Sequence, residues 1–237
     1  MTQASEPVCL LTRPAAEAER FATRVGAELG LRTVTSPLLR IEPVRVEVNW
    51  TARAGVILTS QHAAAQLTAL GAPRDLTVFT AGERTARMAA DQGFRAEPLG
   101  QDVESLLSAL TRRFADQPPT GWFVYLRGEH TRGDLAMRLR ERSIECEEAV
   151  VYQQLAVDLS AEAAALLAGD SAVVAPVFSP RTGGLLAKAA PSLAKTHIIA
   201  MSQNVATPFK DTILSGLTIA AAPTEQAMLA AMKQLRP

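Results

Sequence analysis

The sequence predicts an α/β protein of two similar domains, each built on a parallel sheet, and three observations support this fold class. Short apolar segments alternate along the chain with segments whose apolar residues recur at helical spacing, which is typical of parallel sheets covered by helices. Several strand-and-helix segments resemble segments elsewhere in the chain. The 237 residues, 48% of them hydrophobic, are enough for two ordinary domains with apolar cores.

The first strand and helix are predicted between Val8 and Gly30. Val8 to Thr12 is mostly apolar, as a parallel strand buried on both faces requires. Pro14 suits the first turn of a helix, because its missing N–H costs nothing there, and Gly30 suits the C-terminus. Between these two positions, five apolar residues recur at helical spacing and would form one face of the helix: Ala18, Phe21, Ala22, Val25 and Leu29.

The same pattern recurs along the rest of the chain. Further strands are predicted over Gly55–Ser60, Leu76–Gly82, Ala96–Leu99, Phe123–Arg127, Ala172–Ser179, His197–Ser202 and Leu217–Ala221. The helices after them are predicted over His62–Leu70, Glu83–Gln92, Asp102–Phe114, Gly133–Arg142, Arg181–Ala189, Gln203–Lys210 and Thr224–Leu235. Thr224 is the predicted N-cap of the last helix.

Four segments of the chain pair with four others by similarity. VILTSQHAAAQL resembles PVFSPRTGGLLA, VFTAGERTARMAADQG resembles IIAMSQNVATPFKD, EPLGQDVESLLSAL resembles AAPTEQAMLAAM, and CLLTRPAAEAERFATRV resembles VYLRGEHTRGDLAMRLR. The segments of the fourth pair hold different places: one comes first in its set, at the start of the chain, and the other comes last in its set. We therefore expect the chain to cross twice between two domains, one formed by residues 1–37 and 159–237 and the other by residues 49–146.

The two crossings are predicted over residues 38–48 and 147–158. The first is apolar, bounded by proline and not helical, and the second places β-branched residues and a tyrosine between polar residues. Two extended linkers that run in opposite directions can pair as a two-stranded ladder. Such a ladder would act as a hinge, with a ligand cleft between the domains beside it.

Composition excludes several classes of function. Lys+Arg and Asp+Glu number 24 each, so a general binder of nucleic acid is disfavoured. Two distant cysteines and three scattered histidines argue against a zinc site or a disulfide framework. There is no signal-peptide pattern and no apolar run long enough to span a bilayer, so we expect a soluble protein of the cytoplasm, a reducing compartment. The sequence has neither a Walker-type phosphate loop nor a GxGxxG motif after a strand, so a nucleotide ligand is not indicated.

The ends of the predicted strands point to an anionic ligand. Ligands of parallel α/β sheets bind beyond the carboxyl ends of the strands, and small, hydroxylated or glycine residues predominate there in this sequence. The N-terminus of each following helix offers free N–H groups and a positive dipole end. Five arginines lie at or just after these turns: Arg13, Arg84, Arg127, Arg132 and Arg181. Two such faces opposed across a hinge suit a large, flexible polyanion.

Each candidate also has an ordinary structural interpretation. Hydroxyls such as those of Ser60 and Ser179 are common helix N-caps, and a loop arginine such as Arg13 is usually solvated. The three histidines lack a serine or cysteine partner and are expected to be structural, and both cysteines are expected to be inert. Tyr152 lies in the second linker, where it either faces the cleft or packs on one domain.

Taken in order, these segments resemble the uroporphyrinogen-III synthase family. The matching pieces are LLTRP with its helix, PLLRIEP, ILTS, FTAGERTA with Gly93, LRGEHTRGDLAMRLRERSIECEEAVVYQ, VFSPRTGGLL and MSQNVA. The resemblance covers nearly the whole chain and implies two flavodoxin-like domains joined by a two-stranded linker. It also implies a lyase of tetrapyrrole and haem synthesis that works without metal or cofactor, as a monomer. Such an enzyme cyclises hydroxymethylbilane, a linear tetrapyrrole polyanion, to uroporphyrinogen III, with loss of water and inversion of ring D through a spiro intermediate.

The resemblance also implies roles for individual residues. Tyr152 is the expected catalytic acid, because a phenol with an ordinary pKa of about 10 stays protonated at neutral pH. Val205 stands where many family members have threonine, so that hydroxyl cannot be essential here. The residues expected to position the substrate are Thr12, Arg13, Ser60, Gly82, Thr85, Gly128, Ser179 and Ser202.

Two other classes of function remain compatible with the sequence. One is a non-catalytic relative that binds a tetrapyrrole or regulates its synthesis. The other is an unrelated hinge-type binding protein for a smaller anion.

Overall fold

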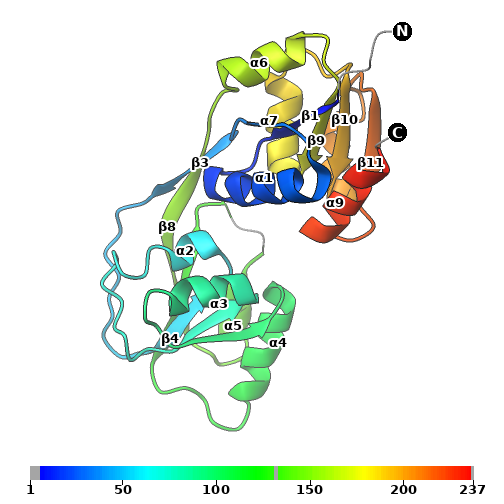
Figure 1. Cartoon of the computed structure of the whole chain (residues 1–237). Helices are drawn as coiled ribbons and strands as arrows, with labels where there is room; N and C mark the ends of the chain where they lie inside the picture. The colour runs from blue at the N-terminus through cyan, green and yellow to red at the C-terminus, as the bar shows by residue number, and fades with distance from the viewer. Residues whose placement is uncertain (1–5, 131–132, 236–237) are drawn as a thin grey trace. The chain divides into compact units, whose positions relative to one another are not determined.

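A computed structural model describes residues 6–130 and 133–235 of the chain. The chain divides into two compact units (Figure 1). Unit 1 comprises Met1–Arg40 and Leu155–Pro237, and unit 2 comprises Ile41–Gln154. Both boundaries fall inside the segments that the sequence predicts as linkers.

Unit 1 contains a parallel sheet in the order β11-β10-β9-β1-β2. Its strands are β1 (Val8–Leu11), β2 (Thr33–Thr35), β9 (Val173–Val177), β10 (Thr196–Ala200) and β11 (Gly216–Ile219). In chain order this is the 2-1-3-4-5 arrangement of flavodoxin-like sheets. This flavodoxin-like topology is the one that the family resemblance implies for the unit.

Helices cover both faces of the unit 1 sheet (Figure 1). α1 (Ala15–Leu29) and α9 (Glu225–Gln234) pack on the face that carries Cys9 and Leu11. The opposite face packs against α6 (Ala161–Ala168), α7 (Pro180–Ala189), α8 (Gln203–Ala206) and the 3-10 helix η1 (Thr207–Phe209). The predicted stripe of α1 faces the core, and Gly30 ends this helix with a left-handed φ of 63°.

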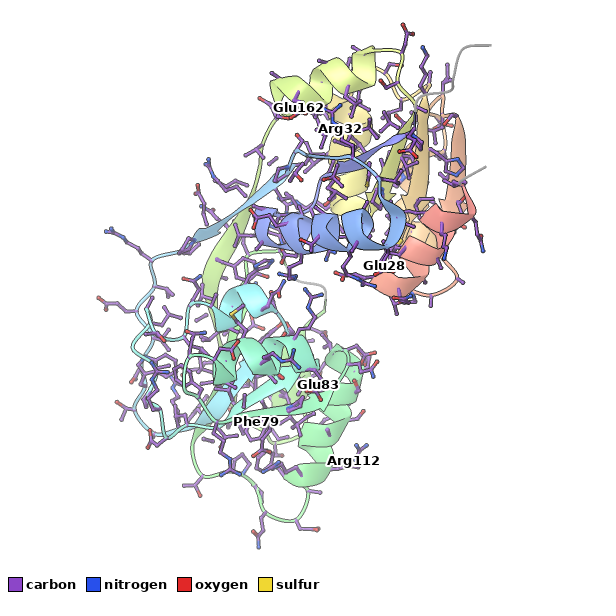
Figure 2. The ribbon with its side chains drawn as sticks, in the orientation of Figure 1. Glu28, Arg32, Phe79, Glu83, Arg112 and Glu162 are labelled. Atoms are coloured by element: carbon purple, nitrogen blue, oxygen red, sulfur yellow. The ribbon has the colours of Figure 1, made fainter. Side chains whose placement is uncertain are left out.

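Unit 2 contains a sheet in the order β3-β8-β7-β4-β5-β6. Its strands are β3 (Leu39–Pro43), β4 (Arg53–Leu58), β5 (Val78–Ala81), β6 (Ala96–Gly100), β7 (Trp122–Gly128) and β8 (Cys146–Ala156). One face packs against α2 (Gln61–Ala64) and α3 (Glu83–Ala90), and the other against α4 (Val103–Arg113) and α5 (Leu135–Arg140). Phe79, labelled in Figure 2, lies on the α4 face, where its ring contacts Phe114 and Phe123.

The two sheets have the same strand order in space, but the chain enters that order at a different strand in each unit. β11-β10-β9-β1-β2 of unit 1 corresponds to β6-β5-β4-β7-β8 of unit 2. These correspondences are the ones that the sequence similarities predict: β4 with β9, β5 with β10, β6 with β11 and β7 with β1. Each unit is thus a circular permutation of the other.

β3 and β8 pair as the sequence predicts, and both cross the boundary between the units. The N–H of Val44 donates to the carbonyl of Val151, and the N–H of Val157 donates to the carbonyl of Leu38. These two pairs define an antiparallel ladder in which Arg40 lies opposite Leu155. β8 also pairs in parallel with β7 over Cys146–Tyr152, so most of the second linker is a strand of the unit 2 sheet.

Several elements differ from the predictions. Helix α6 was not predicted, and the helix expected over Gln203–Lys210 is divided into α8 and η1. The helix expected over His62–Leu70 ends at Ala64, because the next N–H groups bond three residues back in tighter turns. The helix expected over residues 133–142 is limited to α5. The short strand β2 was not predicted, since three residues carry too little periodicity to reveal a strand.

Candidate functional site

Unit 2 brings four of the predicted site residues to one edge of its sheet. Ser60, Gly82 and Gly128 stand at the carboxyl ends of β4, β5 and β7, and Tyr152 lies on β8. These strands are neighbours in the order β8-β7-β4-β5, and they run in parallel. Their carboxyl ends therefore meet at the edge where α/β sheets bind ligands.

The Tyr152 phenol lies at this edge with defined partners. Its side chain is 5% exposed, and its hydroxyl donates a hydrogen bond of 3.1 Å to Oγ of Ser60. The imidazole ring of His62 meets the phenol ring edge-on at a centroid distance of 5.5 Å. Burial raises the pKa of Tyr152, and the hydrogen bond to Ser60 opposes part of that rise. The phenol is therefore protonated at neutral pH and can act as a proton donor.

Gly82 and Thr85 stand at the start of α3. Gly82 adopts φ 86° and ψ 142°, a conformation that is essentially restricted to glycine. Its N–H donates to the carbonyl of Gly100. Thr85 is buried in the first turn of α3. The backbone thus requires glycine at position 82 even before any ligand is considered.

Unit 1 brings the other four predicted residues to the corresponding edge of its own sheet. Thr12 and Arg13 follow β1, Ser179 follows β9, and Ser202 follows β10. These three strands are neighbours in the order β10-β9-β1. Each unit therefore has its own group of candidate residues at the carboxyl ends of adjacent strands.

Arg13 is held by other side chains of unit 1. Its Nη1 donates to Oε1 of Glu225 at 2.7 Å, and its guanidinium lies 4.0 Å from the ring centroid of Phe178. The Arg13 side chain is only 14% exposed. Sequence reasoning missed both partners of Arg13. Phe178 directly precedes Ser179, but no sequence signal connects Arg13 with Glu225, which lies 212 positions away.

The hydroxyl residues of unit 1 differ in their contacts. Ser179 caps α7: its Oγ accepts from the N–H of Thr182 and donates to Oγ1 of Thr182. Ser202 precedes α8 without a side-chain cap bond. Thr12 is 1% exposed, and its Oγ1 has no hydrogen-bond partner in the described part of the chain. Val205 is buried in the apolar core.

The other charged candidates have structural surroundings. Nε of Arg127 donates to Glu148 at 2.9 Å, and Arg84 and Arg181 also have interactions within the chain. Arg132 lies outside the described residues. The ring Nε2 of His197 shares a hydrogen bond with Thr218, and His130 lies beside Glu129.

Neither cysteine is a nucleophile. Both are free and buried, and burial raises the pKa of Cys9 and the pKa of Cys146 to about 12. Both thiols are therefore protonated at neutral pH.

The described residues offer no site for a metal ion, since they contain no cluster of three or more His, Cys, Asp and Glu side chains with suitable geometry. No helix within residues 6–130 and 133–235 is long and apolar enough to cross a membrane. A surface hollow of about 520 Å³ in unit 2 is lined by residues 43–47 and part of the segment after α2. None of the predicted site residues lines this hollow.

The fold is that of a double flavodoxin-like α/β protein, and each unit has a strand-end edge of the kind at which such sheets generally bind ligands. Residues 19–230 match the sequence profile of the family described as uroporphyrinogen-III synthase HemD. Because this match spans most of the chain, the chain belongs to the uroporphyrinogen-III synthase family.

Solved structures of two bacterial proteins resemble this chain. The crystal structure of uroporphyrinogen-III synthetase from Helicobacter pylori shares the fold, with a TM-score of 0.70 and 18% identity, over 97% of this chain and 100% of that chain. A mutant uroporphyrinogen III synthase from Thermus thermophilus has a TM-score of 0.48 and 16% identity, over 96% of this chain and 98% of that chain. No curated protein matches the chain by sequence.

Proposed function

We propose that this chain is a uroporphyrinogen-III synthase that cyclises hydroxymethylbilane to uroporphyrinogen III, with loss of water and inversion of ring D. Membership of the family supports the reaction. The observation that carries the catalytic assignment is the buried, protonated phenol of Tyr152 at the carboxyl edge of the unit 2 sheet. An acid in this position fits a reaction that begins with the departure of a hydroxyl group.

Tyr152 supplies one proton, and the reaction returns one. The C–O bond of the hydroxymethyl group breaks, its electron pair leaves with oxygen, and the phenol proton completes a water molecule. The electron-rich pyrrole stabilises the cation that remains, an azafulvenium ion, and ring D attacks this electrophile through its substituted carbon to form the spiro intermediate. After rearrangement, a ring carbon loses a proton and aromaticity is restored. That proton balances the one that Tyr152 donated.

Orientation supplies most of the selectivity in this proposal. Favouring the inverted isomer about a hundredfold needs a barrier difference of only ~2.7 kcal/mol. Holding the reacting carbon of ring D near its target can contribute that much. The substrate carries carboxylates on its acetate and propionate arms, and the strand-end edge of each unit offers N–H groups at helix starts. We assign substrate positioning to residues of both edges: Thr12, Arg13, Ser60, Gly82, Thr85, Gly128, Ser179 and Ser202.

Two features of the site qualify these assignments. Arg13 already pairs with Glu225, so its charge is partly neutralised before any substrate carboxylate arrives. Ser60 and Gly128 contact Tyr152, which gives them a route to the reaction other than direct substrate contact. We further propose that the enzyme acts as a single chain in the cytoplasm, without a cofactor.

A coupled assay tests this function. Hydroxymethylbilane is generated in place by a bilane-forming enzyme, this protein is added, and the oxidised products are separated by isomer. We expect isomer III in place of isomer I. Isomer I alone from a folded sample would contradict the proposal and leave a non-catalytic tetrapyrrole-binding protein.

The Tyr152→Phe variant tests the catalytic acid. We expect kcat to fall about a hundredfold, the lower end of what general acid catalysis contributes, with little change in KM. Tyr125→Phe is the matched control, since Tyr125 is also buried and its hydroxyl bonds to Thr59 at 2.9 Å. It should retain turnover within about twofold. Unchanged turnover in Tyr152→Phe would remove the acid role.

A further inference from the structure

Gly128 and Tyr152 approach each other so closely that a side chain at position 128 would displace the phenol. The two residues are partners across β7 and β8. A Cβ atom at Gly128 would lie 2.5 Å from Cζ of Tyr152 and 2.8 Å from its hydroxyl oxygen. Its φ is not in the left-handed region, so the requirement for glycine comes from the phenol. The phenol occupies the space that a side chain at position 128 would fill.

An irregularity in β8 directs Tyr152 to this place. Arg127 pairs with Val150, but the next residue, Gly128, pairs with Tyr152, so Val151 is an extra residue in β8. Such a β-bulge reverses the alternation of side chains beyond it. Val151 and Tyr152 accordingly both pack on the α2 face of the sheet, although neighbours in a regular strand face opposite sides. The bulge therefore brings the phenol to the side on which Ser60 lies.

Ser60 accepts the hydrogen bond of the phenol at a fixed position. Its Oγ accepts from Tyr152 at 3.1 Å and from the backbone N–H of His62 at 3.2 Å. The second bond holds the serine side chain at the start of α2, with the His62 ring against the phenol ring. The direction of the Tyr152 O–H bond is thus set by a hydroxyl that the helix itself anchors.

We propose that Ser60, Gly128 and the bulge at Val151 are positioning elements for the Tyr152 phenol, and that they act on the reaction through Tyr152. This inference rests on the proposed acid role of Tyr152. It reassigns Ser60 and Gly128 from substrate contacts to residues that hold the acid. Before donation, Ser60 orients the proton. After donation, the serine hydroxyl can rotate to donate to the phenolate oxygen, because the His62 N–H still satisfies Ser60 Oγ.

A titration tests the role of Ser60 without any measurement of turnover. Tyr125 and Tyr152 are the two tyrosines of the chain. In a Tyr125→Phe background grown with fluorotyrosine, one fluorine resonance reports the ionisation of the phenol at position 152. Ser60→Gly keeps most of the capping of α2 but removes the hydroxyl. We expect it to raise the phenol pKa by about half to one unit, since a hydrogen bond that favours the phenolate is lost.

The matched control for this titration is Ser179→Gly. Ser179 holds the corresponding place in unit 1, where it caps α7 and bonds to Thr182. Its loss should leave the phenol pKa unchanged, and Ser60→Thr should restore it. A phenol pKa that is insensitive to Ser60→Gly would overturn the positioning role of Ser60, whether or not the protein proves to be a synthase.

A double-mutant cycle tests the role of Gly128. We expect Gly128→Ala to displace the phenol and to lower kcat as far as Tyr152→Phe does, with KM within about threefold. In the Tyr152→Phe background, Gly128→Ala should cause no further loss of kcat. The control is Gly26→Ala in α1, where an added Cβ would meet no described atom within 4 Å and kcat should be unchanged.

The alternative outcomes separate the two hypotheses. Two outcomes would make Gly128 a substrate contact and overturn the inference. One is that Gly128→Ala lowers kcat equally in the wild-type and Tyr152→Phe backgrounds, and the other is that it raises KM alone. Each variant is first checked for cooperative unfolding, and Gly128→Ser serves as a second variant with the same expected outcome. If no variant and no wild-type sample forms isomer III, the proposed function fails, and the titration still decides whether Ser60 positions the phenol.

Discussion

At the residue scale, the hydroxyl of Thr12 is a buried polar group of unit 1. It is buried at the carboxyl end of β1 without a hydrogen-bond partner among the described residues. An unpaired buried hydroxyl costs about 1–3 kcal/mol relative to a paired one. Thr12 lowers stability in the free protein and stands at an edge that we propose to bind the substrate, so a substitution here can separate stability from function.

Thr12→Val should therefore separate the two effects. We expect the free energy of unfolding in urea to rise by about 1 kcal/mol, because valine buries no polar atom. We also expect KM for the bilane to rise, since Thr12 is among the residues proposed to position it. Ser179→Ala is the comparison, because it breaks two satisfied hydrogen bonds and should lower stability. A loss of stability in Thr12→Val would show that the hydroxyl is satisfied in solution.

The two cysteines provide a prediction about pH. Burial raises the pKa of Cys9 and of Cys146 to about 12, so both thiols stay protonated in the folded chain at pH 8. As pH rises above the ordinary thiol pKa of about 8.5, the unfolded chain loses these protons first. The contribution of the thiols to stability is therefore complete below that pH and declines between it and about 12.

Alkylation at pH 8 measures this protection. We expect neither cysteine to react in the folded protein and both to react in denaturant, because only the thiolate is nucleophilic. Rapid modification of either thiol under native conditions would show that its surroundings open readily.

At the element scale, Glu225 connects two helices of unit 1. It accepts from Arg13 just before α1, and its other oxygen lies 3.6 Å from Nη1 of Arg24 within α1. Glu225 is also the first residue of α9, where a negative charge favours the helix dipole. One carboxylate thus stabilises the start of α9 and its packing against α1.

Glu225→Gln should lower the free energy of unfolding by about 1 kcal/mol, because it leaves the half-buried Arg13 without its counter-charge. Glu162→Gln is the matched control. Glu162 also pairs with an arginine, Arg32, in unit 1 (Figure 2), but the two side chains are 63% and 67% exposed. Its removal should change stability by less than about 0.5 kcal/mol. Equal effects in urea unfolding would argue against a special role for Glu225.

The sequence predicts elements well where local pattern decides them. The stripe of α1, the cap at Thr224 and the repeated strand-and-helix segments depend on neighbours in the chain. The helix at α2 was predicted but not its early end, and β2 is too short to reveal a period. The same limit applies to the site. Ser60 and Ser179 were predictable as residues that follow strands, whereas the bulge at Val151 depends on tertiary pairing.

At the scale of the whole molecule, the two units share one strand order and differ in where the chain begins. The internal similarities predicted this permutation because each strand kept its own helix and its own strand-end motif. The paired crossings in β3 and β8 place Arg40 opposite Leu155. A tight turn can connect two residues that face each other in an antiparallel ladder.

Unit 1 should therefore fold without unit 2. We expect a chain in which Asn-Gly joins Arg40 directly to Leu155 to unfold cooperatively in urea and to retain helical circular dichroism. Joining Arg40 to Ala156 is the control, since a slip of one residue turns the strand's side chains to the wrong faces. That second chain should be less stable, and equal stability of the two would mean that the ladder does not set the register.

The paired crossings also determine how the molecule bears mechanical load. A force applied to the chain near its two ends acts on unit 1, which contains both. Where β3 and β8 leave unit 1, the hydrogen bond between Val157 and Leu38 belongs to the antiparallel pairing that joins the two strands. Residues 41–154 lie beyond this bond and bear no load while it holds. When the chain is stretched, we therefore expect unit 1 to unfold first. Unit 2 should stay folded and free of tension until the pairing of β3 with β8 breaks.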